Sequence, residues 1–383
     1  MPKCSRVFEQ HRIEIETILG SVRAPSLSRL QELLAKSLGG PLPLPELAEL
    51  LEIGCAPASG EQFEALRCFV LSRFRKPGGN RLRYIAPIYI SSHCIDSCAY
   101  CNFSAARSVP RKRLGLEDFE AELAAVAASG PRVIELVLAT DPDFSPAVLA
   151  RYVARTSEFL NNEPGSGVLL CSDYLPVEVY AALRKEGLWG MVQWDETLDI
   201  QAYNRWHATS PRKRDFVARK RNHERAMSAG LEVATGALFG LADFRYDVLM
   251  QVAKARFLEN EYGRKPFCFG TARITPIGGR ELHPSMAVPD RAYEVALMVY
   301  KIAEPAIARW LQTRETFDMN VRNMLDGDVF TYRCGEVRPG GHRNSLITHA
   351  ASGQFGVNDM PRETAEEKLA ASGFYIDYAW LPN

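Results

Sequence analysis

From residue 84 onward, short apolar runs alternate with longer stretches in which apolar residues recur at helical spacing. Strands that alternate with helices pair in parallel, because each helix carries the chain back across the sheet before the next strand begins. The runs that we interpret as strands are 84–90, 133–139, 167–172, 190–194, 233–239, 267–274, 310–313 and a short eighth at 329–332. Seven or eight such units favour a closed barrel over an open sheet. The sequence therefore predicts an α/β fold, a (β/α)8-like TIM barrel that is complete or nearly complete.

Two further segments flank this barrel, which we place at 79–340. Before it, apolar residues recur at helical spacing with Gly and Pro between the segments, so 1–78 is expected to be an N-terminal helical extension. Where the extension meets the barrel, 76–83 has the composition of a turn-rich linker. After the barrel, 341–383 is expected to be a C-terminal tail that packs on it and contains a final helix and a strand-like end.

Charge and hydropathy narrow the possible partners. The 46 Lys and Arg residues balance 46 Asp and Glu residues, so the formal net charge is zero and no global basic field attracts nucleic acid or an anionic membrane. The first twenty residues carry charges throughout and lack the apolar core of a signal peptide. No uncharged apolar run approaches the ~18 residues of a membrane span. We therefore expect a cytoplasmic protein without a nucleic-acid or membrane partner.

Three of the nine cysteines crowd together directly after the first expected barrel strand, at Cys94, Cys98 and Cys101. In a reducing compartment such a cluster favours metal binding over disulfide formation. Active sites of barrels lie at the C-terminal ends of the strands, which is where this loop begins. The cysteine loop is therefore expected at the mouth of the barrel.

The number of cysteines distinguishes between two kinds of metal site. Thiolates suit both zinc and iron, but a structural zinc site normally closes with four ligands. No fourth cysteine is nearby, and His93 directly precedes Cys94, which makes simultaneous ligation awkward. Three cysteines on a four-iron cluster instead leave one iron free to bind a substrate or cofactor.

The spacing CxxxCxxC, with Tyr100 before the last cysteine, resembles the radical S-adenosylmethionine (SAM) superfamily. This resemblance implies a 4Fe-4S cluster held by Cys94, Cys98 and Cys101, with SAM chelating the open iron. In that family an electron from the cluster cleaves SAM to methionine and a 5′-deoxyadenosyl radical. The resemblance also implies a reductant such as flavodoxin or ferredoxin.

Further matches, which follow one another in order, point to one branch of the superfamily. They are 193–207, 236–247, 272–279, 311–316 and 338–341. Together with the cysteine loop, they resemble 2-iminoacetate synthase (a tyrosine lyase) and the tryptophan lyases, a branch with a biotin-and-thiamin-synthesis-associated domain. The resemblance implies a lyase in which the radical abstracts hydrogen from a small amino-acid substrate of the tyrosine or tryptophan type. Cleavage of a bond to Cα then follows.

The resemblance assigns four side chains to SAM. Tyr100 matches the aromatic position that packs against the adenine, and Asp141 the turn that binds the amino group. Glu196, or its neighbour Asp195, matches the position that contacts the ribose, and Arg219 would pair with the carboxylate. An alternative for Asp141 is the N-cap of the next helix. The other basic residues between 212 and 225 are expected to form a solvated surface.

Two side chains are assigned to the substrate in the same way. Arg314 matches the arginine that binds the amino-acid carboxylate, for which a guanidinium offers a bidentate fork. Tyr89 matches the tyrosine near the substrate amino group. The alternatives are a packing role in the barrel wall for Tyr89 and an internal salt bridge with Glu315 for Arg314.

One segment departs from the pattern of the branch. Where tyrosine lyases carry a serine- and glycine-rich loop, this chain has Tyr332, Arg333, Cys334 and Glu336. The added arginine and glutamate could recognise a polar substrate tail, which keeps two alternatives open. One is a radical SAM enzyme of cofactor or natural-product biosynthesis that acts on a different small carboxylate by rearrangement or methyl transfer, and the other is a non-catalytic iron–sulfur carrier. No cysteine follows Cys334, so we expect no second cluster of the hydrogenase-maturation type.

Overall fold

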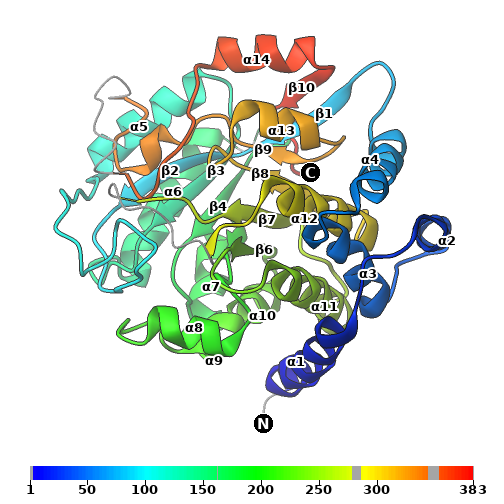
Figure 1. Ribbon diagram of the computed structural model, residues 1–383. Coiled ribbons are helices and arrows are strands. Elements are labelled where there is room, and N and C mark those ends of the chain that lie inside the picture. The colour runs from blue at the N-terminus through cyan, green and yellow to red at the C-terminus, as the bar shows by residue number, and fades with distance from the viewer. Residues whose placement is uncertain (1–2, 162, 278–285, 344–352, 383) are drawn as a thin grey trace.

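The computed structural model describes residues 3–161, 163–277, 286–343 and 353–382, and one parallel sheet of ten strands organises them (Figure 1). The strand order is β10-β1-β9-β8-β7-β6-β5-β4-β3-β2. The strands are β1 (Asn80–Tyr84), β2 (Ala86–Ser91), β3 (Val133–Leu138), β4 (Gly167–Cys171), β5 (Leu188–Val192), β6 (Glu232–Phe239), β7 (Cys268–Arg273), β8 (Ala308–Leu311), β9 (Val329–Phe330) and β10 (Phe374–Asp377).

The sheet curls into a ring that closes at the segment formed by β1 and β2. β1 and β2 are separated only by Ile85, yet β1 pairs with β9 whereas β2 pairs with β3. The two short strands thus share one position of a ring whose other seven positions are β3 to β9. The predicted barrel is confirmed. The prediction of a linker at 76–83 is wrong from Asn80 onward, where β1 begins. This strand is short and directly follows the turn residues 77–79, and only its alternating burial distinguishes it from the turn.

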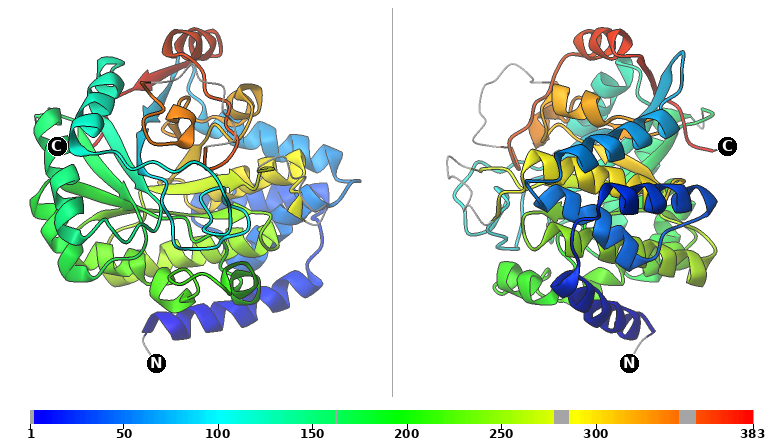
Figure 2. Two further views of the ribbon diagram at one scale, coloured as in Figure 1. Left: turned by 90° about the vertical axis from the view of Figure 1, so that its left-hand side faces the viewer. Right: turned by 45° about the vertical axis from the view of Figure 1, so that its right-hand side comes forward.

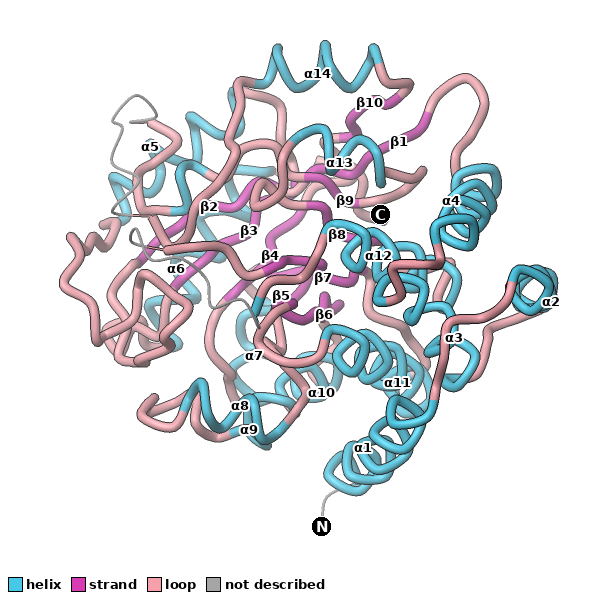
Figure 3. Tube along the Cα trace, in the orientation of Figure 1, coloured by secondary structure: helices cyan, strands magenta, loops and turns pink. Residues whose placement is uncertain are grey.

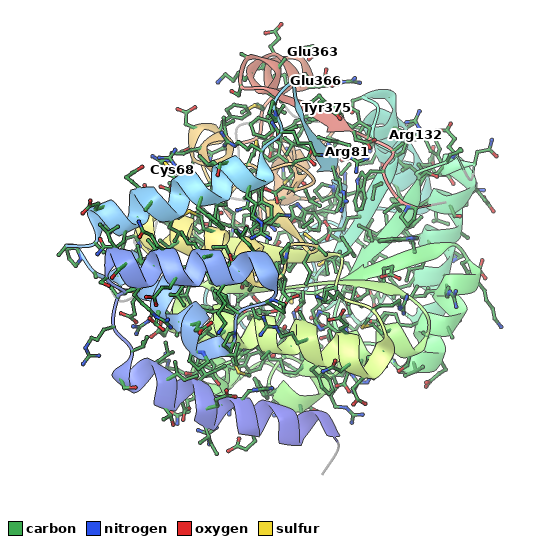
Figure 4. The ribbon with its side chains drawn as sticks, turned by 90° about the vertical axis from the view of Figure 1, so that its right-hand side faces the viewer. Cys68, Arg81, Arg132, Glu363, Glu366 and Tyr375 are labelled. Carbon is green, nitrogen blue, oxygen red and sulfur yellow. The ribbon has the colours of Figure 1, made fainter. Side chains whose placement is uncertain are left out.

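Helices cover the outside of the curled sheet (Figures 1 and 3). Those between the strands are α5 (Leu116–Ala128), α6 (Pro146–Leu160), α7 (Val177–Lys185), α8 (Ile200–His207), α9 (Phe216–Lys220), α10 (Asn222–Ser228), α11 (Phe244–Tyr262), α12 (Asp290–Ala303) and α13 (Phe317–Asn323). Before them come α1 (Lys3–Ser21), α2 (Leu27–Gly39), α3 (Leu44–Cys55) and α4 (Gly60–Phe74). This N-terminal group packs on the outer side of α11 and α12, as the view in Figure 4 shows.

The C-terminal segment joins the sheet instead of only packing on it. After α14 (Arg362–Ala371), β10 pairs in parallel with β1, with Phe374 opposite Asn80. None of the helices in the described part of the chain combines the length and low charge that a membrane span requires.

The two ends of the barrel differ. At the N-terminal ends of the strands a buried apolar layer fills the interior, and it includes Ile85, Val133, Leu169, Val192, Ala234, Cys268, Ala308 and Val329. At the C-terminal ends, loops gather instead, and the segment 92–115 crosses the front of this end in the left panel of Figure 2. The interior is therefore closed at one end and accessible at the other, as in other barrels of this kind.

A buried ion pair joins β8 to β9 at the closed end. Arg309 is 1% exposed, and its guanidinium binds both carboxylate oxygens of Asp328 and the carbonyls of Leu297 and Asn323. Replacing Arg309 with alanine leaves a buried carboxylate without its cation. We expect the free energy of unfolding, measured by urea denaturation, to fall by about 3 to 5 kcal/mol.

An exposed ion pair provides the matched control. Arg155 on α6 pairs with Glu120, and both side chains are largely exposed. Arg155→Ala should change the free energy of unfolding by less than about 1 kcal/mol. Equal effects of the two substitutions would contradict a structural role for the Arg309 pair.

Candidate active site

A cavity opens at the C-terminal ends of the strands. It measures about 1270 Å³ when the space open to solvent is included. The charged and sulfur-bearing residues of its lining are Cys94, Asp96, Cys98, Cys101, Glu135, Cys171, Asp173, Glu196, Lys213, Arg219, Arg314 and Cys334. Eight of the nine residues predicted for the site line this cavity, and only Asp141 lies outside the lining.

The three clustered cysteines lie on the loop that follows β2. Their thiols line one cavity, although among the described residues no three His, Cys, Asp or Glu side chains converge closely enough to hold a single metal ion. The cysteines of a four-iron cluster bind different irons and surround the cluster, so they need not converge on one point. The donor set therefore fits a 4Fe-4S cluster with one iron lacking a protein ligand.

Two side chains that the sequence did not single out shape this loop. Asp96, which is fully buried between two of the cysteines, accepts hydrogen bonds from the backbone N–H groups of Arg212 and Lys213 at 2.9 and 3.1 Å. Arg111 donates to four backbone carbonyls of the loop, including those of Ser92 and Phe103. Burial raises the pKa of Cys98 to about 12, so iron must displace the proton when it binds.

Tyr100 occupies the position expected from its place in the motif. It is 8% exposed, its hydroxyl is hydrogen-bonded to Nε2 of His207, and its ring meets the edge of Trp206. These contacts hold the ring at the cavity wall beside the cysteines. The adenine-packing role assigned by resemblance stays a prediction.

Glu196 lies in the cavity with an unusual backbone conformation. Its φ of 65° is in the left-handed region, which a residue with a side chain adopts only when its surroundings impose it. Its carboxylate pairs with Lys213 at 2.5 Å and with Arg219 at 3.3 Å. Burial alone would raise the pKa of Glu196, but these two cations outweigh it and lower the pKa to about 2. The carboxylate is therefore ionised at neutral pH.

Arg219 has the features of an anion-binding residue. It is 4% exposed, and its Nε is buried without a hydrogen-bond partner in the described part of the chain. An unpaired buried donor costs free energy unless a ligand satisfies it. This open donor, beside a paired carboxylate and lysine, fits a ligand that carries a carboxylate, as SAM does.

The surface role expected for the rest of the basic segment is wrong for two lysines, whereas Arg214 is exposed as expected. Lys213 lines the cavity, and Lys220 is 1% exposed. Lys220 and Lys254 flank Asp195, which is fully buried and absent from the cavity lining. Of the two acidic residues proposed for the ribose, the structure therefore places only Glu196 in the cavity. A cluster of basic residues in the sequence does not reveal that acidic partners come from other strands.

Asp141 does not occupy the position expected of it. Its carboxylate forms a bidentate pair with Arg113 at 2.7 and 2.9 Å and accepts a hydrogen bond from Ser91. With its oxygens engaged, it offers little to an ammonium group in the cavity. The N-cap alternative is also wrong, because Ser145 caps α6. From the same turn, Thr140 does line the cavity.

Arg314 is the cation that the resemblance assigns to the substrate carboxylate. Its guanidinium lies 3.5 Å from the centre of the Phe355 ring, and its buried Nε has no hydrogen-bond partner among the residues that the structure describes. The alternative of a salt bridge with Glu315 is wrong, because Glu315 pairs with Arg273. Burial lowers the pKa of Arg314, although an arginine stays charged at neutral pH. Tyr89 is 7% exposed and lines the same cavity.

The segment 353–358, which we call the strap, contributes Gln354 and Phe355 to the cavity lining. Gln354 accepts a hydrogen bond from the Tyr89 hydroxyl at 3.0 Å and donates one to the sulfur of Cys101 at 3.6 Å. Its backbone carbonyl accepts from the N–H of Asn102 at 3.0 Å. The strap thus contacts the cysteine loop, Tyr89 and, through Phe355, Arg314.

Gln354 should influence the cluster through its N–H···S bond. Hydrogen bonds to the sulfurs help to set the reduction potential of iron–sulfur clusters. Replacing Gln354 with glutamate keeps an acceptor for Tyr89 but removes the donor to Cys101. We expect a more negative midpoint potential in a redox titration followed by electron paramagnetic resonance (EPR). An unchanged potential in both Gln354→Glu and Gln354→Ala would contradict this contact.

The altered segment around 330–338 contributes less to the cavity than expected. Only Cys334 of its distinctive residues lines it, and the thiol lies 3.2 Å from the Thr313 hydroxyl. Tyr332 is hydrogen-bonded to Tyr378, and Arg333 donates to the carbonyl of His342. Arg333 is therefore turned away from the cavity, and the idea that it recognises a substrate tail finds no support.

Comparison with known proteins points to one superfamily. No family model matches the chain. The 2-iminoacetate synthase of Escherichia coli (strain K12) is 27% identical over 323 residues, which span 83% of this chain and 83% of that protein. The chain is a radical SAM protein. The predictions of this superfamily, of the 2-iminoacetate synthase branch and of the 4Fe-4S cluster and SAM are thereby confirmed.

Solved structures support the fold of this radical SAM protein. The FeFe-hydrogenase maturase HydG from Carboxydothermus hydrogenoformans superposes with a TM-score of 0.79 at 23% identity, covering 98% of this chain and 81% of that one. Methylornithine synthase (PylB) superposes with a TM-score of 0.70 at 18% identity, covering 90% and 97%. At these identities the likeness concerns the fold alone.

Proposed function

We propose that this radical SAM protein is a lyase that acts on a free α-amino acid of the tyrosine or tryptophan type and cleaves a bond to Cα. The observation that carries the proposal is the guanidinium of Arg314, whose buried Nε has no hydrogen-bond partner among the described residues and which lines the same cavity as Tyr89 and the three cysteines. The sequence likeness to 2-iminoacetate synthase supports the same reaction class. We further propose that the protein is cytoplasmic, does not bind nucleic acid and receives electrons from a flavodoxin or ferredoxin.

The cofactor end of the cavity would be formed by residues from three parts of the barrel. When bound, the cluster and SAM supply a 5′-deoxyadenosyl radical by reductive cleavage. Arg219 would bind the SAM carboxylate with its open Nε, and Glu196 would accept hydrogen bonds from the ribose. Tyr100 would pack against the adenine. The structure favours no role for Asp141 toward SAM, since Arg113 occupies it.

The substrate end would hold the amino acid by its charged head. Arg314 would bind the carboxylate through a bidentate fork, and the stacked ring of Phe355 fixes the plane of that fork. The hydroxyl of Tyr89, held by Gln354, would lie near the amino group. This arrangement would present the amine, from which hydrogen is abstracted, toward the cofactor end.

The strap would also protect the reaction. A radical enzyme must keep water and side reactions away from its reactive species. Gln354 and Phe355 cover the junction between the cofactor and substrate ends, because they contact Cys101 on one side and Arg314 on the other. The strap would therefore limit access to the cavity once both ligands are bound.

One assay tests the proposal. Anaerobically reconstituted protein with dithionite and SAM should form 5′-deoxyadenosine, and tyrosine or tryptophan should accelerate this. p-Cresol or an indole fragment should appear as a product. Failure of both amino acids to stimulate the reaction, in protein that does form 5′-deoxyadenosine, would refute the lyase proposal.

A second candidate has one specific observation in its favour. The 3-methylornithine synthase of Methanosarcina acetivorans is 23% identical over 165 residues, which span 43% of this chain and 45% of that protein. A rearrangement of a different small carboxylate would then replace lysis. Stimulation of 5′-deoxyadenosine formation by an aliphatic amino acid, without a lysis product, would favour this candidate.

A further inference from the structure

A carboxyl group lies inside the barrel without a role in the reaction described above. Glu135, in the middle of β3, is 6% exposed, and its side chain lines the cavity. No ion pair engages it among the described residues, and the thiol of Cys171 is the hydrogen-bond partner that lowers its pKa. A thiol is a weak donor. A nearly buried carboxyl group facing a cavity with only this partner has capacity to bind a ligand.

The strand register places Glu135 deeper in the barrel than the residues proposed to bind the amino and carboxylate groups of the substrate. Tyr89 is level with Val137, and Val137 with Cys171, whereas Glu135 is level with Pro87. Because side chains two residues apart point to the same face, Glu135 lies roughly 7 Å deeper than the level of Tyr89. Arg314 lies beyond the end of β8, near the mouth. An amino acid held by Arg314 and Tyr89 at its head can therefore extend its side chain inward to Glu135.

The surroundings of Glu135 suit an aromatic side chain with a polar tip. Phe103, Trp194 and Trp310 contribute to the same lining. Burial raises the pKa of Glu135 to about 8, so its neutral carboxyl form prevails at pH 7. The carbonyl oxygen of a neutral carboxyl group accepts a hydrogen bond without requiring a cation. A ring without a donor would leave that oxygen desolvated and unpaired.

We propose that Glu135 is a specificity-determining residue that accepts a hydrogen bond from the far end of the substrate side chain, a phenol O–H or an indole N–H. The inference rests on the proposed function, since it needs Arg314 and Tyr89 to hold the head of an amino acid. It extends that function by naming the residue that distinguishes these side chains from a plain aromatic ring.

Two matched pairs of ligands test the inference in the reconstituted full chain. The pairs are tyrosine with phenylalanine, and tryptophan with 3-benzothienylalanine, in which sulfur replaces the indole N–H. Calorimetry with SAM present should show that the donor-bearing member of at least one pair binds about tenfold or more tightly. Glu135→Leu should abolish that preference, whereas Glu135→Gln, which keeps a carbonyl acceptor, should retain part of it. Cys334→Ala, at another lining position, should leave it intact.

The outcomes separate this inference from the function on which it rests. Binding that depends on Arg314 but shows no preference within either pair would overturn the role of Glu135 and leave the lyase proposal standing. A preference that persists in Glu135→Leu would also overturn it. If none of the four amino acids binds, the proposed function itself fails. The comparison within each pair uses the wild-type protein, so it holds even if a Glu135 variant folds poorly.

Discussion

Arg314→Ala is expected to weaken binding of an aromatic α-amino acid by roughly 100-fold, or about 2 to 3 kcal/mol. The guanidinium packs against Phe355 and forms no ion pair with a carboxylate of the described residues, so a ligand carboxylate would meet an available cation. Calorimetry on reconstituted protein measures the affinity directly. Iron content should not change, because Arg314 is not a cluster ligand.

Arg314→Lys is the matched control for charge. Lysine keeps a positive charge but lacks the planar fork, so binding should recover only in part. Arg214→Ala, at an exposed position, should leave the affinity unchanged. Full affinity in Arg314→Ala, or loss of the cluster in that variant, would contradict a role in binding the substrate carboxylate.

Cys98→Ser is expected to cause the largest loss. Cys98 is 4% exposed and faces the cavity with Cys94 and Cys101, so removal of its thiol should leave the cluster with two ligands. Reconstituted protein should lose most of its iron, and 5′-deoxyadenosine should fall below detection. Iron and sulfide analysis together with EPR checks the first expectation.

Another cysteine of the same cavity supplies the control. Cys334 lines the cavity but is held by Thr313, away from the cysteine loop in sequence. Cys334→Ser should retain the cluster. If both variants keep iron, or both lose it, the three-cysteine assignment does not stand.

The barrel and the cysteine loop could be predicted because both depend on local sequence. Alternating strands and helices define the topology, and the motif places Cys94, Cys98 and Cys101 within eight residues of each other. β1 was missed because it is short and follows a Gly-rich turn, and its partners β9 and β10 lie far along the chain. Local patterns cannot reveal such distant pairing.

Charged residues were harder to interpret, because their partners come from other strands. Arg113 neutralises Asp141, and Glu196 draws Lys213 into the cavity. Neither pairing has a signal in the sequence near either member. The sequence did not indicate Gln354 for the same reason, because its contacts with Tyr89 and Cys101 span more than 250 residues.

Glu135 did carry a signal that could have been used. It is the one charged residue in the apolar run 133–139, for which the sequence predicts a strand. Glutamate is seldom buried without a partner, so its presence inside such a strand indicates a special environment. The direction of its side chain, into the cavity instead of toward a helix, required the structure.

The central claim is that one iron of the cluster lacks a protein ligand and binds SAM. EPR of the dithionite-reduced, reconstituted protein, recorded with and without SAM, tests it most directly. The account predicts a 4Fe-4S signal that changes when SAM is added. A signal indifferent to SAM, or zinc in place of iron at the three cysteines, would contradict it.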